Sequence, residues 1–174
     1  MPFLVGAGDL LDSVMSTGSI SLSGFWGGEF RKFSCNQTPN QVIASISKKE
    51  GIFQLSGDAA SFDSKNGSWL QALAAWRSPI ILMASPLSNG NFPGATYAYA
   101  ALCNELSVPL IGIIQLGGFW DPKNRIMDGL PWCGWLSIQN SLELVKNQIE
   151  NELYPMTGEE VCENLRLRLL MLNL

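Results

Sequence analysis

Histidine is absent from this chain of 174 residues. Catalytic Ser-His-Asp and Cys-His groups need an imidazole as their base, and mixed histidine/carboxylate metal sites need one as a ligand. The sequence therefore excludes both kinds of site. Cysteine pairs of the form Cys-x-x-Cys are also absent, because Cys35, Cys103, Cys133 and Cys162 lie far apart. In a chain this apolar, these four residues are predicted to be reduced thiols that are mostly buried.

Charge and long apolar runs are scarce as well. Charged residues make up 15% of the chain and hydrophobic residues 47%, and the net charge of −4 is unsuited to the phosphates of nucleic acid. No apolar run approaches the roughly 20 residues that a membrane-spanning helix needs. The first fifteen residues also lack the basic start of a secretory signal. We therefore expect a single cytoplasmic domain over residues 1–174, with neither nucleic acid nor membrane as a partner.

Short apolar runs rich in β-branched residues are present near residues 52–56, 80–84 and 110–116. Such runs are typical of strands that are buried on both faces. Segments with helical character separate them, so the chain alternates strand and helix. This alternation predicts the α/β class, with a doubly wound, mainly parallel sheet flanked by helices. Ligands of such sheets bind at the carboxyl ends of the strands.

Capping residues mark where several of the helices begin. N-caps are predicted at Thr38, at Asn66 or Ser68, and at Thr157. Apolar residues also recur at helical spacing over residues 138–153. Residues 137–174 are therefore predicted to form two C-terminal helices. The last helix is apolar on more than one side, which suits either packing against the sheet or a surface for a protein partner or a second copy of the chain.

Residues 1–35 form an atypical N-terminal segment. The apolar cluster in residues 1–18 suits a short strand or a helix, and the alternation from Ser19 to Ser23 predicts an edge strand. Gly6 to Asp9 contains two glycines but lacks the third glycine of a dinucleotide fingerprint. No strand is predicted before it, so this segment is only weak evidence for a nucleotide site.

Three short motifs follow one another in a familiar order. They are Ser56-Gly57-Asp58-Ala59-Ala60 after a strand, the strand Gly112 to Leu116, and the loop Gly129-Leu130-Pro131. Over residues 40–136 the chain resembles the later half of dethiobiotin synthetase and related MinD/CobB-type P-loop ATPases. The resemblance implies ATP with Mg²⁺ as ligand, Ser56, Gly57 and Asp58 toward the phosphates, and Asp58 near the metal. It also implies adenine near Gln115, Leu130 and Pro131.

The chain departs from that family where its phosphate chemistry lies. No Gly-Lys dipeptide is present, so the family's phosphate loop, with its lysine and its Mg²⁺-binding hydroxyl, is missing. Ser56 replaces the acidic residue that opens the family's Gly-rich loop. Gln115 replaces an adenine-reading asparagine, although its amide keeps a donor and an acceptor.

These departures leave two functions open. The first is a degenerate, non-catalytic domain of the P-loop ATPase type that binds a nucleotide weakly or binds a protein partner. The alternative is an ATP-dependent ligase of the dethiobiotin synthetase type, with phosphate binding rebuilt from Ser88–Gly94 or Ser23–Gly28. Ser88, Asn89 and Gly90 precede a predicted helix N-terminus, where free N–H groups favour anions, but such loops are also ordinary connections. A first strand and phosphate loop supplied by another polypeptide is a third hypothesis.

Loop aspartates and tryptophans complete the candidates. Asp58, Asp63 and Asp121 fall in loops predicted at one sheet edge, where they either hold Mg²⁺ through water or form solvated turns. The polar segment 121–127 and the aromatic loop 129–134 are both predicted to lack regular structure. The cluster of Trp120, Trp132 and Trp135 suits a recognition surface or a local hydrophobic plug.

Overall fold

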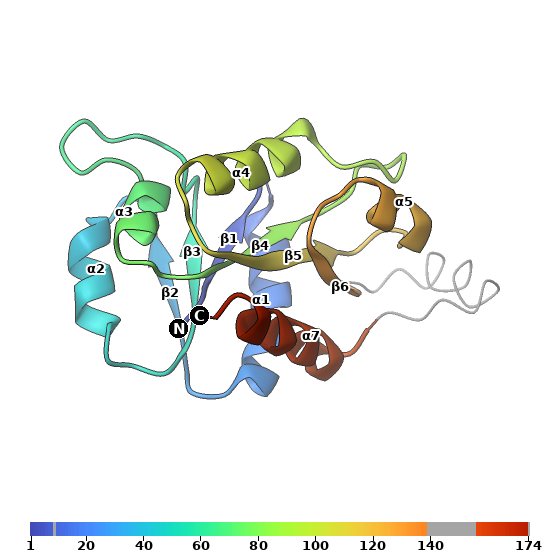
Figure 1. Cartoon of the computed structure of the whole chain (residues 1–174), viewed down its shortest axis with the longest axis horizontal. Helices are drawn as coiled ribbons and strands as arrows, with labels where there is room; N and C mark the ends of the chain where they lie inside the picture. The colour runs from blue at the N-terminus through green and yellow to red at the C-terminus, as the bar shows by residue number, and fades with distance from the viewer. Residues whose placement is uncertain (9, 139–155, 174) are drawn as a thin grey trace.

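The computed structural model describes residues 1–8, 10–138 and 156–173 (Figure 1). Six strands form one sheet: β1 (Phe3–Gly6), β2 (Glu29–Ser34), β3 (Gly51–Ser56), β4 (Ile80–Ala84), β5 (Leu110–Leu116) and β6 (Trp132–Leu136). The helices are α1 (Asp12–Trp26), α2 (Pro39–Ile46), α3 (Trp69–Ala75), α4 (Gly94–Glu105), α5 (Pro122–Met127) and α7 (Gly158–Met171).

Every neighbouring pair of strands in this sheet is parallel. The predicted strands near 52–56, 80–84 and 110–116 are confirmed as β3, β4 and β5. In the β4–β5 pair, Ile80 lies beside Leu110 and Ala84 beside Gln115. All five residues of β4 are buried because helices cover both faces of the sheet. The predicted fold class is therefore confirmed.

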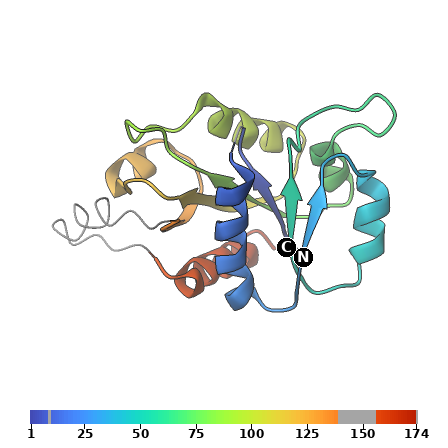
Figure 2. The same ribbon diagram turned by 180° about the vertical axis from the view of Figure 1, so that it is seen from behind.

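The strand order is β2-β3-β1-β4-β5-β6, which places the first strand inside the sheet. Apolar residues of α2, α3 and α4 pack on one face, and those of α1 and α7 pack on the other. Figures 1 and 2 show these two layers from opposite sides. The connection from β1 leaves toward one face, whereas those from β3 and β4 leave toward the other. The carboxyl end of β1 is thus a topological switch point, the usual place for a ligand in such sheets.

The predicted strand at Ser19–Ser23 is wrong, because these residues lie inside α1. The buried stripe of this helix consists of Met15, Gly18, Ser19 and Leu22, which have helical spacing. Two members of the stripe are not hydrophobic, so the apolar pattern alone does not reveal it. A Cβ atom on Gly18 would lie 2.7 Å from Leu116 Cδ2 and 2.8 Å from Met83 Cε, so glycine lets α1 approach the sheet closely.

The N-terminal segment contains the two strands β1 and β2. β1 ends at Gly6, so the short strand suggested for residues 1–18 is present, and the expectation that no strand precedes this glycine is wrong. Strand β2 was not predicted, because its sequence EFRKFS is largely polar and it forms an edge of the sheet. An edge strand has one open side, so polar side chains are tolerated there.

Two segments predicted to lack regular structure contain it. Asp121–Met127 contains α5, because the Asp121 carboxylate accepts a hydrogen bond from the Asn124 N–H (3.1 Å) and caps the helix. The loop at 129–134 leads into β6, which pairs with β5 in the register of Ile113 beside Trp132. The two tryptophans of β6 favour a strand, but its glycine and the preceding Gly129-Leu130-Pro131 indicate a turn and hide that signal.

The predicted capping residues are largely confirmed. Ser68 and Thr157 each form a capping box with the residue three positions on, and Thr38 occupies an N-cap position without a side-chain capping bond. Of the two predicted C-terminal helices, α7 is present, and the prediction for 138–153 falls almost entirely outside the described residues. All four cysteines are free, and three of them are buried. Among the described helices, none is both long and apolar enough to cross a membrane.

Candidate functional site

A cavity of about 400 Å³ opens at the carboxyl ends of β1 and β3. We call it the switch-point crevice. Its lining includes Gly6, Gly8, Leu10, Leu11, Asp12, Met15, Ser56, Gly57 and Asp58. Figure 2 shows the arrowheads of β1 and β3 pointing to this edge. The predicted loop residues Ser56, Gly57 and Asp58 are therefore brought together, and they face the connection between β1 and α1.

The connection between β1 and α1 is held close to the start of α4. Gly8 has a φ of +64°, and a Cβ atom there would lie 2.6 Å from the Ala95 Cβ. Both the left-handed backbone and the contact require glycine at this position. The crevice wall at this point is therefore backbone, with no side chain in the way.

A charged pair lies at the first turn of α1. The Lys32 ammonium, from β2, lies 2.6 Å from the Asp12 carboxylate and 3.2 Å from the Ser16 hydroxyl. The hydrogen bond from Lys32 is the main reason that the pKa of Asp12 is lowered. Beneath this pair, the fully buried Gln54 donates to the Ser16 hydroxyl over 3.4 Å. Its Oε1 atom has no hydrogen-bond partner among the described residues.

A second cavity, of about 370 Å³, adjoins the crevice and shares Gly57 and Asp58 with it. The Asp58 carboxylate accepts hydrogen bonds at Oδ1 from the Tyr99 hydroxyl and from the Ala60 N–H (2.9 Å). Burial, and next the charge of Asp58, raises the pKa of Cys35 to about 12. Burial and the hydrogen bond to Asp58 raise the pKa of Tyr99 as well.

Among the described residues, acidic side chains are the only charged groups that line these two cavities. Asp12, Asp58 and Asp63 are part of the lining, and no lysine or arginine of the described chain is. Asp63 uses Oδ1 to close its own loop by accepting hydrogen bonds from Lys65 and Asn66. The third predicted carboxylate, Asp121, instead caps α5. In the described parts of the chain, no group of three His, Cys, Asp or Glu residues is arranged to hold a metal ion.

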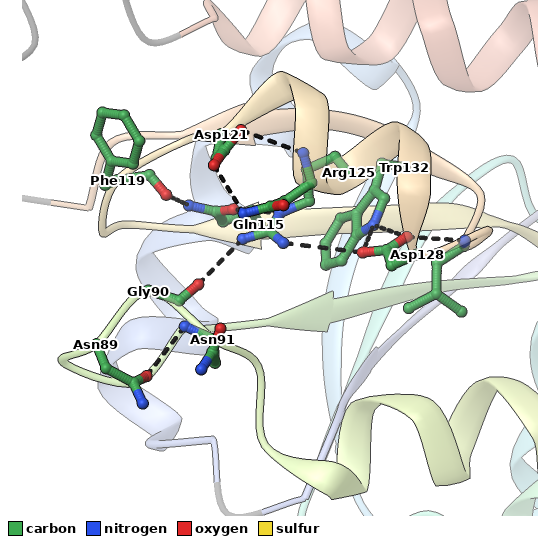
Figure 3. A network of polar contacts seen from close by, with 11 residues as sticks. Asn89, Gly90, Asn91, Gln115, Phe119, Asp121, Arg125, Asp128 and Trp132 are labelled. Atoms are coloured by element: carbon green, nitrogen blue, oxygen red, sulfur yellow. Dashed lines mark hydrogen bonds and ion pairs between the residues drawn. The ribbon is translucent and has the colours of Figure 1, made fainter.

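The opposite half of the same edge, beyond β4, contains a filled network (Figure 3). Arg125, only 8% exposed, lies 4.3 Å from the ring centroid of Phe92 and 5.1 Å from that of Trp132. It donates to Gly90 O (3.3 Å) and Gln115 Oε1 (3.2 Å), and the carboxylate of Asp128 lies 3.8 Å away. Burial lowers the pKa of Arg125, and Asp128 opposes that effect. We call these residues the Arg125 cluster.

Gln115 is a structural member of this cluster. Its amide donates to Gly117 O (2.8 Å) and Phe119 O (2.9 Å), and its carbonyl accepts from Arg125. The side chain is fully buried. A base read by Gln115 would therefore have to replace bonds that already exist.

The loop with Ser88, Asn89 and Gly90 lies beside the Arg125 cluster rather than at the crevice. Leu87 donates to Asn91 O over 2.7 Å, and Asn91 donates to Asn89 Oδ1 over 3.0 Å, so the loop is a compact turn (Figure 3). Gly90 O is the acceptor for Arg125. The alternative candidate at Ser23–Gly28 lies at the other edge of the sheet, at the carboxyl end of α1, where the helix dipole disfavours anions.

Leu130 and Pro131 are separated from Gln115 along the strand direction. They precede β6, and they line a groove of about 720 Å³ together with Val108 and Pro109, which precede β5. The resemblance implies one adenine near Gln115, Leu130 and Pro131, but strand β6 places the last two at its amino end, away from the carboxyl end of β5 where Gln115 lies. Gln115 and Pro131 do not form one pocket.

The three tryptophans do not form a single cluster either. Trp120 and Trp132 meet edge to face, with centroids 6.1 Å apart. Trp132 donates its indole N–H to the Asp128 carboxylate (2.9 Å), and Trp135 is buried in β6. The first two behave as the predicted hydrophobic plug, because they pack around Arg125.

Sequence reasoning missed Asp12, Lys32 and Tyr99 at the crevice. Asp12 is the first residue of a helix that follows Gly6 and Gly8, so a strand prediction at residues 3–6 would have revealed it. Lys32 and Tyr99 give no local signal, because only the fold brings β2 and α4 to the crevice. The chain matches no model of a known protein family and no curated protein sequence, so the resemblance to P-loop ATPases remains a prediction.

Proposed function

We propose that this chain is a degenerate, non-catalytic domain of the P-loop ATPase type that binds a nucleotide weakly at the switch-point crevice. The carrying observation is the connection between β1 and α1. It occupies the chain position at which the resembled family has its phosphate loop, and it lies at the switch point where α/β sheets bind ligands.

The chemistry of this connection supports binding without phosphoryl transfer. Phosphoryl transfer depends on positive groups that neutralise the charge developing on the phosphate oxygens. In the part of the chain that the structure describes, no lysine or arginine lines the crevice. Lys32, which lies near its wall, forms an ion pair with Asp12.

The competing hypothesis, an ATP-dependent ligase, requires a positive group at this position. Lys32 is the residue that would have to supply it, by leaving Asp12 and turning toward a bound phosphate. Loss of the ion pair would expose the Asp12 carboxylate to the same phosphate, and the two negative groups would repel each other. The geometry therefore favours the non-catalytic alternative.

Calorimetric titration and thermal denaturation with ATP, ADP and adenosine test this proposal, with and without Mg²⁺. Binding to the native state raises the apparent stability, so a rise in Tm that saturates with ligand is expected. Release of phosphate from ATP should stay at the level of a protein-free control. Turnover within the usual enzyme range of about 1–1000 s⁻¹ would contradict the non-catalytic assignment.

This experiment tests the nucleotide and not the alternative ligand class, a protein partner. If none of the three compounds changes Tm or releases heat, the nucleotide proposal is wrong. The proposed function would then be wrong, and a protein partner would remain as the alternative ligand of this chain.

A further inference from the structure

We infer that the switch-point crevice prefers an uncharged nucleoside to its phosphate esters. This inference rests on the proposed function, and it reverses the order of affinities that a phosphate-binding site shows. It follows from three features of the crevice: the charge of its lining, the free oxygen of the Asp58 carboxylate, and the pairing of its nearest lysine.

The charge of the lining repels phosphate. Asp12 and Asp58 line the crevice, Asp58 and Asp63 line the adjoining cavity, and neither has a basic residue in its lining over residues 1–8, 10–138 and 156–173. The net charge of the chain, −4, adds to this field. Each phosphate group on a ligand therefore adds repulsion instead of an ion pair, whereas a nucleoside has no charge to repel.

Carboxylates at this position suit hydroxyl groups. In open α/β sheets an acidic residue near the switch point commonly accepts hydrogen bonds from ribose hydroxyls. Both hydrogen bonds that the Asp58 carboxylate accepts from the described residues reach Oδ1, which leaves Oδ2 available to a hydroxyl donor. Tyr99 and Ala60 hold the carboxylate in place from one side, so its orientation is fixed before a ligand arrives.

Lys32 does not reverse this preference. Its ammonium lies 2.6 Å from Asp12 and 3.2 Å from Ser16, so a phosphate would have to compete with a carboxylate that is already in place. The buried Gln54, which donates a hydrogen bond to the Ser16 hydroxyl, has an Oε1 atom without a hydrogen-bond partner among the described residues. This oxygen is an acceptor, so it cannot form a hydrogen bond with a phosphate oxygen.

The test is a series of calorimetric titrations with adenosine, AMP, ADP and ATP, at fixed ionic strength and without Mg²⁺. We expect affinity to fall along this series, with ATP at least about tenfold weaker than adenosine. ATP binding more tightly than adenosine would overturn the inference and leave the proposed function intact. Absence of binding by all four compounds would overturn the proposed function as well.

A variant pair locates the effect. Asp58→Asn removes one negative charge from the crevice and keeps the size of the side chain. Adenosine should bind about fivefold more weakly because a charge-assisted hydrogen bond is lost, and ATP about threefold more tightly because repulsion falls. Glu105→Gln makes the same change in net charge on an exposed residue at the far end of α4, and it should alter neither affinity. Equal effects of the two variants would show that the order reflects net charge alone, which would overturn the assignment to the crevice.

Discussion

The two halves of the carboxyl edge are built in opposite ways. Beyond β4, the Arg125 cluster fills the edge with a buried cation, aromatic rings and hydrogen bonds that Arg125 and Gln115 donate to loop carbonyls (Figure 3). Beside β1 and β3, the edge is hollow and acidic, and Lys32, which lies near the crevice, is paired with Asp12. The same edge thus has a consolidated half, which is the Arg125 cluster, and an open half, which is the switch-point crevice.

This difference suggests that one half of the edge contributes to the stability of the fold and the other half to ligand binding. Arg125 connects the loop after β4, the end of β5 and helix α5, so its bonds are committed to holding loops together. In the crevice, the exposed side chain of Asp58 lies in the lining, and its carboxylate can exchange water for a ligand. We therefore expect mutations in the first half to change unfolding and mutations in the second to change ligand affinity.

The largest expected effect is that of Arg125→Ala on stability. It leaves Asp128 without its buried cation and leaves Gly90 O and Gln115 Oε1 without a donor, so we expect a loss of about 3–5 kcal/mol in the free energy of unfolding. Urea unfolding followed by tryptophan fluorescence measures it. Lys123→Ala, an exposed residue on the same helix, is the control and should change little. A small loss for Arg125→Ala would mean that the cluster is not the consolidated half.

Substitution of Gly8 by alanine should cost about 1–3 kcal/mol, because the new Cβ meets Ala95 and the backbone is left-handed. Gly24→Ala is the matched control, since no heavy atom lies within 4 Å of its added Cβ and it lies inside α1. That control should gain about 0.5–1 kcal/mol in helix stability. Thermal denaturation of both variants gives the comparison, and equal Tm changes would contradict the close approach.

The reactivity of Cys35, which lines the adjoining cavity, depends on the negative charge of Asp58. Its pKa is raised from 9.0 to about 12, so little thiolate forms at neutral pH. Asp58→Asn removes the second cause of that shift and should speed iodoacetamide labelling at pH 9 by about two- to fivefold. Glu105→Gln should not change the rate. An unchanged rate in Asp58→Asn would show that burial alone protects the thiol.

The same pKa shift has a consequence for stability. A thiol with a raised folded pKa holds its proton in the native state after the unfolded chain has lost it. Its contribution is therefore complete below about pH 9 and is lost as the pH rises from 9 toward 12. Unfolding measured across this range should show stability falling with pH, and less steeply in Cys35→Ala.

The smallest effect is expected for Lys32→Gln. The ion pair with Asp12 is exposed at both ends, with side-chain exposures of 41% and 60%, so it contributes under about 1 kcal/mol. Unfolding at low and high salt should show this small difference shrinking as salt screens the pair. Lys65→Gln, with no ion pair among the described residues, is the control. A loss comparable to that of Arg125→Ala would erase the difference between the two halves.

The central strands could be predicted because their sequences carry the required information themselves. The apolar runs of β3, β4 and β5 are buried on both faces. Ser68 and Thr157 mark the starts of their helices, because each forms local N-capping hydrogen bonds. These signals need no distant partner.

The missed elements depend on the rest of the fold. The buried stripe of α1 includes Gly18 and Ser19, which are buried because Leu116 and Met83 leave room only for small residues. The candidate site divides in the same way. Ser56, Gly57 and Asp58 could be predicted as one loop, but their pairing with Asp12 and Tyr99 depends on the strand order, and the separation of Gln115 from Pro131 depends on β6.

Strand β2 also bears on how this protein avoids aggregation. In the described part of the chain, its outer side has no neighbouring strand, and such an open side is a template on which a strand from another molecule can add. Arg31 and Lys32 stand on this margin with exposures of 46% and 41%, so an incoming strand would have to strip water from two cations. A largely polar sequence thus limits fibre-like growth of the sheet from this side.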